Sequence, residues 1–271
     1  MTSTMTSRLT DEGLCLDEYS SNETYASVHF KRAVGELPEM ECSKAMARLV
    51  AERMPANGDI LDVGCGAGHY LRSFKNAISL PFQYVGIDYY PILLEKAAQA
   101  WGNEPTASFR QASIFDMPVE DGEFDIATCS NLLMHLPSIV KPMSELIRAS
   151  RKWVLVRTMI GDRSYRIQEV LSKQWWAFTD VAAEQEFDDE GQPRSFSYEN
   201  IYSKEYFTGV IRRFAPDARI TYIKDDQYQP QNIQQSADTE GLVNATRIID
   251  GMQVFGYIIL PYTFVVIELP A

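Results

Sequence analysis

Residues 59–70 read DILDVGCGAGHY, and this stretch decides how the rest of the chain is interpreted. An apolar run, interrupted by Asp62, ends at three glycines spaced two apart: Gly64, Gly66 and Gly68. The pattern is typical of a buried parallel strand, a tight turn and a helix that begins at His69. Glycines in such a turn let a ligand approach the backbone and its free amide N–H groups. The stretch therefore predicts a strand, a ligand-binding loop and a helix.

A second apolar run, residues 82–87, predicts the next strand, and Asp88 follows it directly. An acid at this place, about twenty residues after the glycine loop, commonly accepts the ribose hydroxyls of an adenosine-containing ligand. The alternative is that Asp88 caps the helix that begins near Pro91. The loop and the acid together predict a site for an adenosine-containing ligand.

The spacing of the glycines separates two kinds of nucleotide site. Dinucleotide-binding loops favour G-x-G-x-x-G, whereas residues 64–68 read G-x-G-x-G, with Asp62 two positions before the first glycine. This pattern resembles motif I of the class I S-adenosylmethionine-dependent methyltransferases. VGIDYYP at residues 85–91 resembles the family's motif II, and residues 112–137 resemble its adenine loop and fourth strand. The resemblance covers about residues 60–158 and implies an enzyme of this family, of the small-molecule type.

The resemblance also implies which residues hold S-adenosyl-L-methionine. The glycine loop would line the methionine and the ribose. Ser113 replaces an acid that commonly binds the adenine amino group, while Ile114 would supply a backbone N–H and an apolar edge. Cys129 is expected near the methionine amino group, with Asn131 and Leu132 beside the transferred methyl. The expected cofactor-binding residues are Asp62, Gly64, Cys65, Gly66, Gly68, Asp88, Tyr89, Ser113, Ile114, Cys129, Asn131 and Leu132.

Methyl transfer from a sulfonium is an in-line displacement, so alignment of the two reactants supplies much of the catalysis. A base is needed only when the nucleophile starts protonated. His135 is a candidate base or else has a structural role, and Tyr202 is a second catalytic candidate. Arg157 is expected either to bind a substrate carboxylate or to pair with a neighbouring surface acid. The expected substrate-binding residues are Tyr25, His29, Arg157, Trp176, Tyr198 and Tyr202; Tyr25 and His29 have the alternative of packing at the domain edge.

The chain is expected to form an α/β fold with a doubly wound, mostly parallel seven-stranded sheet. Residues 219–224 and 263–269 predict its closing antiparallel hairpin. Helical spacing over 165–178, among many aromatic residues, predicts part of a substrate lid. Residues 241–249 suggest a short helix, although the structure of 226–260 stays open. The expected division is an N-terminal helical cap (1–56), a cofactor-binding core (57–159), an inserted lid (160–215) and strands that complete the sheet (216–271).

Composition excludes several other classes. The net charge of −12 disfavours a nucleic-acid partner, which needs a basic surface. The chain has no apolar run long enough to span a membrane and no apolar core of a secretory signal at its start. The four cysteines are scattered without a C-x-x-C pair, which favours a reducing cytoplasm and predicts no metal site.

The sequence is also compatible with two other functions. A nicotinamide-dependent oxidoreductase would share the adenosine site, but the glycine spacing and the SNLLMHLP segment at 130–137 disfavour it. A methyltransferase-like ligand-binding protein without activity would keep both the loop and Asp88. The sequence leaves open the methyl acceptor, the use of a base and the oligomeric state, with oxygen or nitrogen of a small metabolite as the expected target.

Overall fold

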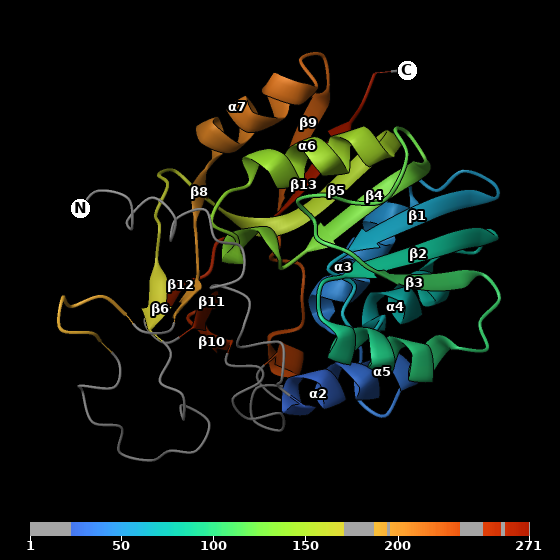
Figure 1. Cartoon of the computed structure of the whole chain (residues 1–271), viewed down its shortest axis with the longest axis horizontal. Helices are drawn as coiled ribbons and strands as arrows, with labels where there is room; N and C mark the ends of the chain where they lie inside the picture. The colour runs from blue at the N-terminus through green and yellow to red at the C-terminus, as the bar shows by residue number, and fades with distance from the viewer. Residues whose placement is uncertain (1–22, 171–186, 194–195, 234–245, 256–257, 271) are drawn as a thin grey trace.

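The computed structural model describes residues 23–170, 187–193, 196–233, 246–255 and 258–270. Its centre is one large sheet (Figure 1). The parallel strands are β1 (Gly58–Val63), β2 (Phe82–Asp88), β3 (Ala107–Gln111), β4 (Phe124–Ser130) and β5 (Ser150–Gly161). Strand β13 (Tyr262–Glu268) runs antiparallel between β5 and β9 (Arg219–Lys224). The order is β3-β2-β1-β4-β5-β13-β9, and this confirms the expected fold.

One strand beyond the expected seven joins the sheet: the short β8 (Tyr202–Ser203) pairs in parallel with the end of β5. Helices cover both faces of the sheet (Figure 1). α6 (Val140–Ala149) and α7 (Lys204–Phe214) pack on one face, and α3 (Glu41–Ala51) and α4 (His69–Ala77) on the other. α2 (Glu23–Val34) packs against α4 and α5 (Pro91–Trp101).

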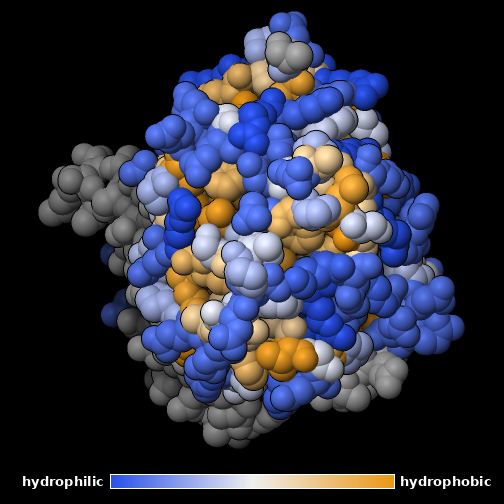
Figure 2. Space-filling model, turned by 90° about the vertical axis from the view of Figure 1, so that its right-hand side faces the viewer, coloured by the Kyte–Doolittle hydropathy of each residue, from blue (hydrophilic) through white to orange (hydrophobic). Residues whose placement is uncertain are grey.

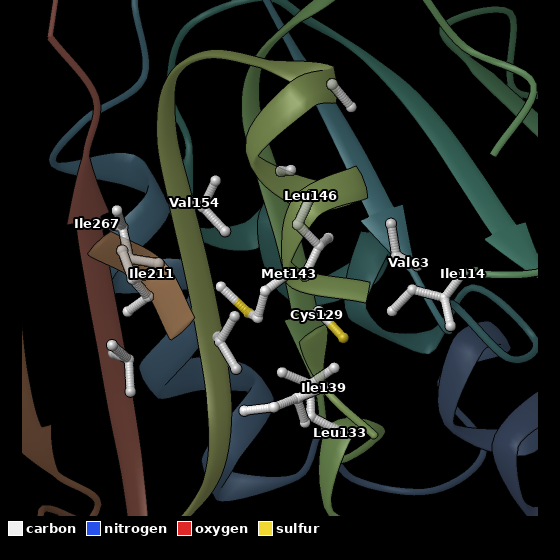
Figure 3. Close-up of a cluster of buried hydrophobic side chains, with 14 of the residues drawn as sticks. Val63, Ile114, Cys129, Leu133, Ile139, Met143, Leu146, Val154, Ile211 and Ile267 are labelled. Carbon is white, nitrogen blue, oxygen red and sulfur yellow. The ribbon is translucent and has the colours of Figure 1, made fainter. Parts of the chain in front are cut away.

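The core has two layers because the parallel strands are buried on both faces, which requires apolar side chains in near-continuous runs. In β1, Ile60 points toward α3 and α4, while its neighbours Leu61 and Val63 point toward α6. Figure 3 shows the second layer, in which Met143 and Leu146 of α6 lie over the sheet. The packed strands and helices form a rigid base for the loops at the strand ends.

Two of the expected helices are wrong in their described parts. Within the predicted helix 165–178, β6 (Gln168–Val170) instead pairs antiparallel with β7 (Phe196–Tyr198). Pairing with a distant segment outweighs local helical spacing here, since strand formation depends strongly on such context. Trp176 and residues 171–186 lie outside the described residues.

The second correction concerns residues 247–249, which were expected to be helical. They form β10 (Arg247–Ile249), which pairs with β11 (Met252–Phe255), and β12 (Ile258–Ile259) pairs with β11 in turn. Asp250 and Gly251 link β10 and β11 with φ angles of 48° and 78°. Positive φ at both central residues is the geometry of a two-residue hairpin turn, and Asp-Gly favours it. This local signal was available in the sequence.

The surface is mixed in character on the side that lies to the right in Figure 1. There, hydrophobic residues occur in groups interrupted by polar ones (Figure 2). Within the part of the chain that the structure describes, no helix has both the length and the apolar character needed to cross a bilayer. The same residues contain no cluster of three or more His, Cys, Asp or Glu side chains arranged to hold a metal ion.

Candidate functional site

The glycine loop between β1 and α4 has a backbone that only glycine adopts easily. Gly64, Gly66 and Gly68 have φ angles of 77°, 56° and 72°. A Cβ atom on Gly64 would lie 2.9 Å from Cδ2 of Leu132, and one on Gly68 would lie 2.8 Å from the Trp101 ring. The positive φ angles, and the close neighbours of Gly64 and Gly68, explain why these positions are glycine. Because glycine has no side chain, the loop backbone stays open to a ligand.

Asp88 closes the loop from the end of β2. Its Oδ2 accepts a hydrogen bond from the Gly66 N–H at 2.8 Å, and its Oδ1 accepts one from the Tyr90 N–H at 3.0 Å. The carboxyl is buried, and burial raises its pKa although these backbone N–H groups oppose the shift. Tyr90 precedes the first turn of α5, so Asp88 also supports that helix start. Both interpretations of Asp88 from the sequence are compatible with this geometry.

A cavity of about 630 Å³ opens above the loop, and its size suits a small organic ligand. It lies at the carboxyl ends of β1, β2 and β4, where open parallel sheets bind their ligands. Its lining includes these expected cofactor residues: Gly64, Gly66, Asp88, Tyr89, Ser113, Ile114, Asn131 and Leu132. The remaining four lie outside the lining: Asp62, Cys65, Gly68 and Cys129.

Comparison with known proteins concerns the part of the chain that contains this loop. Residues 60–152 match the family model of a methyltransferase domain. A 2-phytyl-1,4-naphtoquinone methyltransferase from Trichormus variabilis is 34% identical over 119 residues, which are 43% of this chain and 52% of that protein. An uncharacterized methyltransferase from Schizosaccharomyces pombe is 32% identical over 118 residues, 41% of each chain. Residues 60–152 therefore match a methyltransferase domain, in agreement with the resemblance to the class I S-adenosylmethionine-dependent methyltransferases.

Solved structures agree on the fold. An S-adenosylmethionine-dependent methyltransferase from Mesorhizobium loti aligns over 87% of this chain and 99% of its own, with a TM-score of 0.51 at 14% identity. The matches to the curated relatives named above span 41% and 52% of those proteins. The residues that match the family model include the glycine loop and Asp88.

Behind the loop of the methyltransferase domain, Asp62 links three strands. Its carboxylate accepts hydrogen bonds from the Tyr84 hydroxyl at 2.8 Å and from the Thr128 hydroxyl at 2.9 Å. Burial raises the pKa of Asp62 to about 6, against the effect of these two hydrogen bonds, and Asp88 adds to the rise. Asp62 therefore ties β1, just before the glycine loop, to β2 and β4.

This pKa predicts a pH-dependent stability. The folded-state pKa of Asp62 exceeds its ordinary value of 3.8, so the folded protein binds more protons between these values than the unfolded chain. The contribution of Asp62 to stability is thus full below about pH 4 and is lost as the pH rises through about 6. We expect Asp62→Asn to reduce the fall in the free energy of unfolding over this range, measured by urea titration. Asp116→Asn, at an exposed site, is the control, and equal slopes in all three proteins would contradict the prediction.

Much of the cavity is lined by residues from distant parts of the chain. Tyr25, His29 and Arg157, all expected at the substrate, are among them. Sequence reasoning missed several others: Arg32, Cys42, His69, Tyr70, Asp225, Tyr228, Gln253 and Tyr262. Only His69 carried a local signal, since it directly follows the last glycine of the loop. The others come together only through the tertiary fold.

Arg157 is buried, and its donors are engaged. Its Nε donates to Oδ2 of Asp225 at 2.8 Å, its Nη2 donates to the same oxygen, and its Nη1 donates to Oδ1 of Asn131. The guanidinium carbon lies 3.7 Å from the centroid of the Tyr262 ring. The arginine does pair with an acid, but that acid is buried rather than at the surface.

His135 lines the cavity beside the methyltransferase loop. Its Nδ1 lies 2.8 Å from the Tyr198 carbonyl oxygen and 3.2 Å from Oε1 of Glu199. Burial disfavours protonation of this imidazole, but Glu199 and the Tyr198 carbonyl outweigh burial and raise its pKa. The geometry therefore allows both expected roles, a base at the cavity and a structural link to Tyr198.

Tyr198 and Tyr202 are not brought to the cavity. Both side chains are buried, and the Tyr202 hydroxyl donates to the Leu133 carbonyl at 2.9 Å. Burial raises the pKa of this hydroxyl, which disfavours the ionised form that a base would need. The catalytic and substrate-binding roles expected for Tyr202, and the binding role expected for Tyr198, have no support in this geometry.

Proposed function

We propose that this chain is a methyltransferase that transfers the methyl group of S-adenosylmethionine to an oxygen or nitrogen of a small metabolite. The observation that carries the proposal is the cavity at the strand ends, with the left-handed glycine loop as its floor and Asp88 at its edge. Besides the naphtoquinone methyltransferase, a tocopherol O-methyltransferase from Arabidopsis thaliana is 32% identical over 94 residues, which supports a small organic acceptor.

The residues around the loop fit the cofactor. Asp88 would accept the ribose hydroxyls, the loop backbone would lie along the ribose and the methionine, and Ser113 and Ile114 would border the adenine. When bound, S-adenosylmethionine supplies a methyl group already activated by a sulfonium. The protein's own contribution is to hold the two reactants in line and to exclude water. His135 would take the proton of an acceptor that starts protonated.

The acceptor end of the cavity favours an uncharged molecule. Three N–H groups of Arg157 donate to Asp225 and Asn131, and its charge is already paired with Asp225, so an acidic substrate would compete with Asp225 for it. Tyr70 and Tyr262 supply aromatic walls, and the Tyr70 hydroxyl donates to Sγ of Cys42 at 3.4 Å. We infer a neutral, ring-bearing acceptor with a hydroxyl or amine to be methylated.

The cover over this end is proposed from the lining residues. None of the described residues of 160–215 lines the cavity, and α7 instead packs with α6 in the core. Tyr228, Gln253 and Tyr262 of the C-terminal segment do line it, as does α2. We therefore assign the substrate cover to α2 and to Tyr228, Gln253 and Tyr262. The described cysteines Cys42, Cys65 and Cys129 are free thiols, which supports the expected reducing cytoplasm.

A thermal-shift experiment tests the cofactor. A ligand that binds only the folded state stabilises it by about 2.7 kcal/mol at a hundred times its Kd. We expect S-adenosylhomocysteine to raise the melting temperature of the protein and NAD to leave it unchanged. A shift with NAD alone would instead support the oxidoreductase.

A second measurement separates the enzyme from a binding protein without activity. With S-adenosylmethionine labelled in its methyl group, we expect transfer of the label to at least one member of a panel of neutral phenols, quinols and amines. Binding of S-adenosylhomocysteine without transfer to any of them would favour the inactive protein.

A further inference from the structure

Three polar residues of α2 share one helical face toward the glycine loop. Tyr25, His29 and Arg32 are spaced so that their side chains lie above one another, and all three line the cavity. The end of α2 is tied to α4, because Nη1 of Arg72 donates to the carbonyl oxygens of Arg32 and Leu37, each at 2.9 Å. The face is thus held in place beside the start of α4.

His29 meets His69, the first residue of α4, at this face. The two ring centroids lie 4.4 Å apart, and the Tyr25 ring lies 4.3 Å from that of His29. Each histidine is only 8% exposed, yet Nδ1 of each has no hydrogen-bond partner among the described residues. A buried polar atom without a partner costs free energy, so such atoms in a cavity point to a ligand. The Cβ of a residue replacing Gly66 would lie 3.6 Å from Nδ1 of His69, which places this atom over the loop.

The charges at this end of the cavity favour an anion. Arg32 is buried, and its charge lowers the pKa of both imidazoles. Burial and Arg32 lower the pKa of His69 to about 3, and burial, His69 and Arg32 lower that of His29, so both rings are neutral and each keeps one N–H. Burial, with Asp88, raises the pKa of Tyr25 to about 12, so its hydroxyl also keeps its proton.

The helix beginning at His69 adds to this preference. The first turn of α4 contains no acidic residue, and its N-cap, Gly68, offers no side chain to the free N–H groups. Such a helix start carries a partial positive charge that stabilises anions. The nearby acid Asp88 is turned to the N–H groups of Gly66 and Tyr90.

We propose that His29, Arg32 and His69 bind the carboxylate at the amino-acid end of the cofactor, the only anionic group of S-adenosylmethionine. The inference rests on the proposed function. The two neutral imidazoles donate hydrogen bonds, and Arg32 supplies the charge. This cluster then selects adenosine ligands that carry a carboxylate over those that lack one.

The test compares two ligands that differ only in the carboxylate. Calorimetry with S-adenosylhomocysteine and with decarboxylated S-adenosylhomocysteine is carried out on the wild-type protein and on His69→Phe. Phenylalanine keeps a ring against His29 and Tyr70 but has no nitrogen. We expect the Kd of S-adenosylhomocysteine to rise about tenfold to a hundredfold, the effect of losing a hydrogen bond to a charged group. The Kd of the decarboxylated ligand should stay within about twofold.

Matched variants test whether the change in affinity is specific to His69. His135→Phe changes another histidine of the same cavity and should leave the ratio of the two affinities unchanged. His69→Gln, which retains a hydrogen-bonding side chain, should recover part of the preference for S-adenosylhomocysteine over the decarboxylated ligand. If His69→Phe does not fold, His69→Gln and His29→Phe replace it in the same comparison.

Three outcomes overturn the inference. Equal loss of affinity for both ligands in His69→Phe would show that the ring only supports the loop. An unchanged preference in both His69→Phe and His29→Phe would place the carboxylate elsewhere. Unchanged affinity in His29→Phe together with lost methyl transfer would make His29 a base instead. If wild-type protein binds no S-adenosylhomocysteine at all, the proposed function itself fails, and this is a distinguishable result.

Discussion

Replacing Asp88 by alanine should weaken the binding of S-adenosylhomocysteine by about 1.5–3 kcal/mol, the range for a hydrogen bond to a charged group. This corresponds to a Kd about ten to a hundred and fifty times higher, which calorimetry measures directly. The carboxylate has two effects on the site. It would accept the ribose hydroxyls, and it holds the loop through the Gly66 N–H.

Asp88→Asn separates these two effects. The amide oxygen can still accept from a backbone N–H, so the loop keeps a tie while the negative charge is lost. We expect a smaller loss of affinity in Asp88→Asn than in Asp88→Ala. Asp116→Ala is the control, because Asp116 is an exposed acid of the loop that follows β3 and does not line the cavity. Unchanged affinity in Asp88→Ala would contradict the placement of the ribose at Asp88.

Replacing Asp225 by alanine should lower the free energy of unfolding by about 3–5 kcal/mol, because it leaves the charge of Arg157 buried without its partner. The side chains of Arg157 and Asp225 are each only 4% exposed. The pair joins the end of β5 to the segment after β9, so the substrate end of the cavity should also loosen. Urea unfolding measures the loss, with circular dichroism as the signal.

Two comparisons establish that burial causes this effect. Arg151 pairs with Asp59 at 2.7 Å, but Arg151 is 43% exposed, so Asp59→Ala should cost only about 0.2–1 kcal/mol through that ion pair. The double variant Arg157→Met with Asp225→Leu removes both charges and should recover much of the stability. A loss for Asp225→Ala no larger than that of the exposed pair would contradict the prediction.

Much of the core followed from local patterns in the sequence. The starts of α4 and α5 and the bounds of β9 agree with those expected from residue spacing and helix-start signals. The G-x-G-x-G spacing and the acid after the next strand led to the methyltransferase domain, since glycine at positive φ and an acid at a strand end are requirements of the backbone and the ligand. The residues that meet these requirements lie within about thirty positions of one another, so they form a recognisable local pattern in the sequence.

Much of the cavity lining was decided by contacts between distant residues. Arg157 and Asp225 are separated by 68 positions, and His29 and His69 meet only because α2 packs against α4. The same holds for β6 and β7, whose pairing overrode a local helical pattern. The residues therefore specified the cofactor loop and the fold class locally. Only packing of the whole chain decided which side chains line the rest of the cavity, because such contacts depend on how separate elements are arranged in space and leave no periodic signal along the chain.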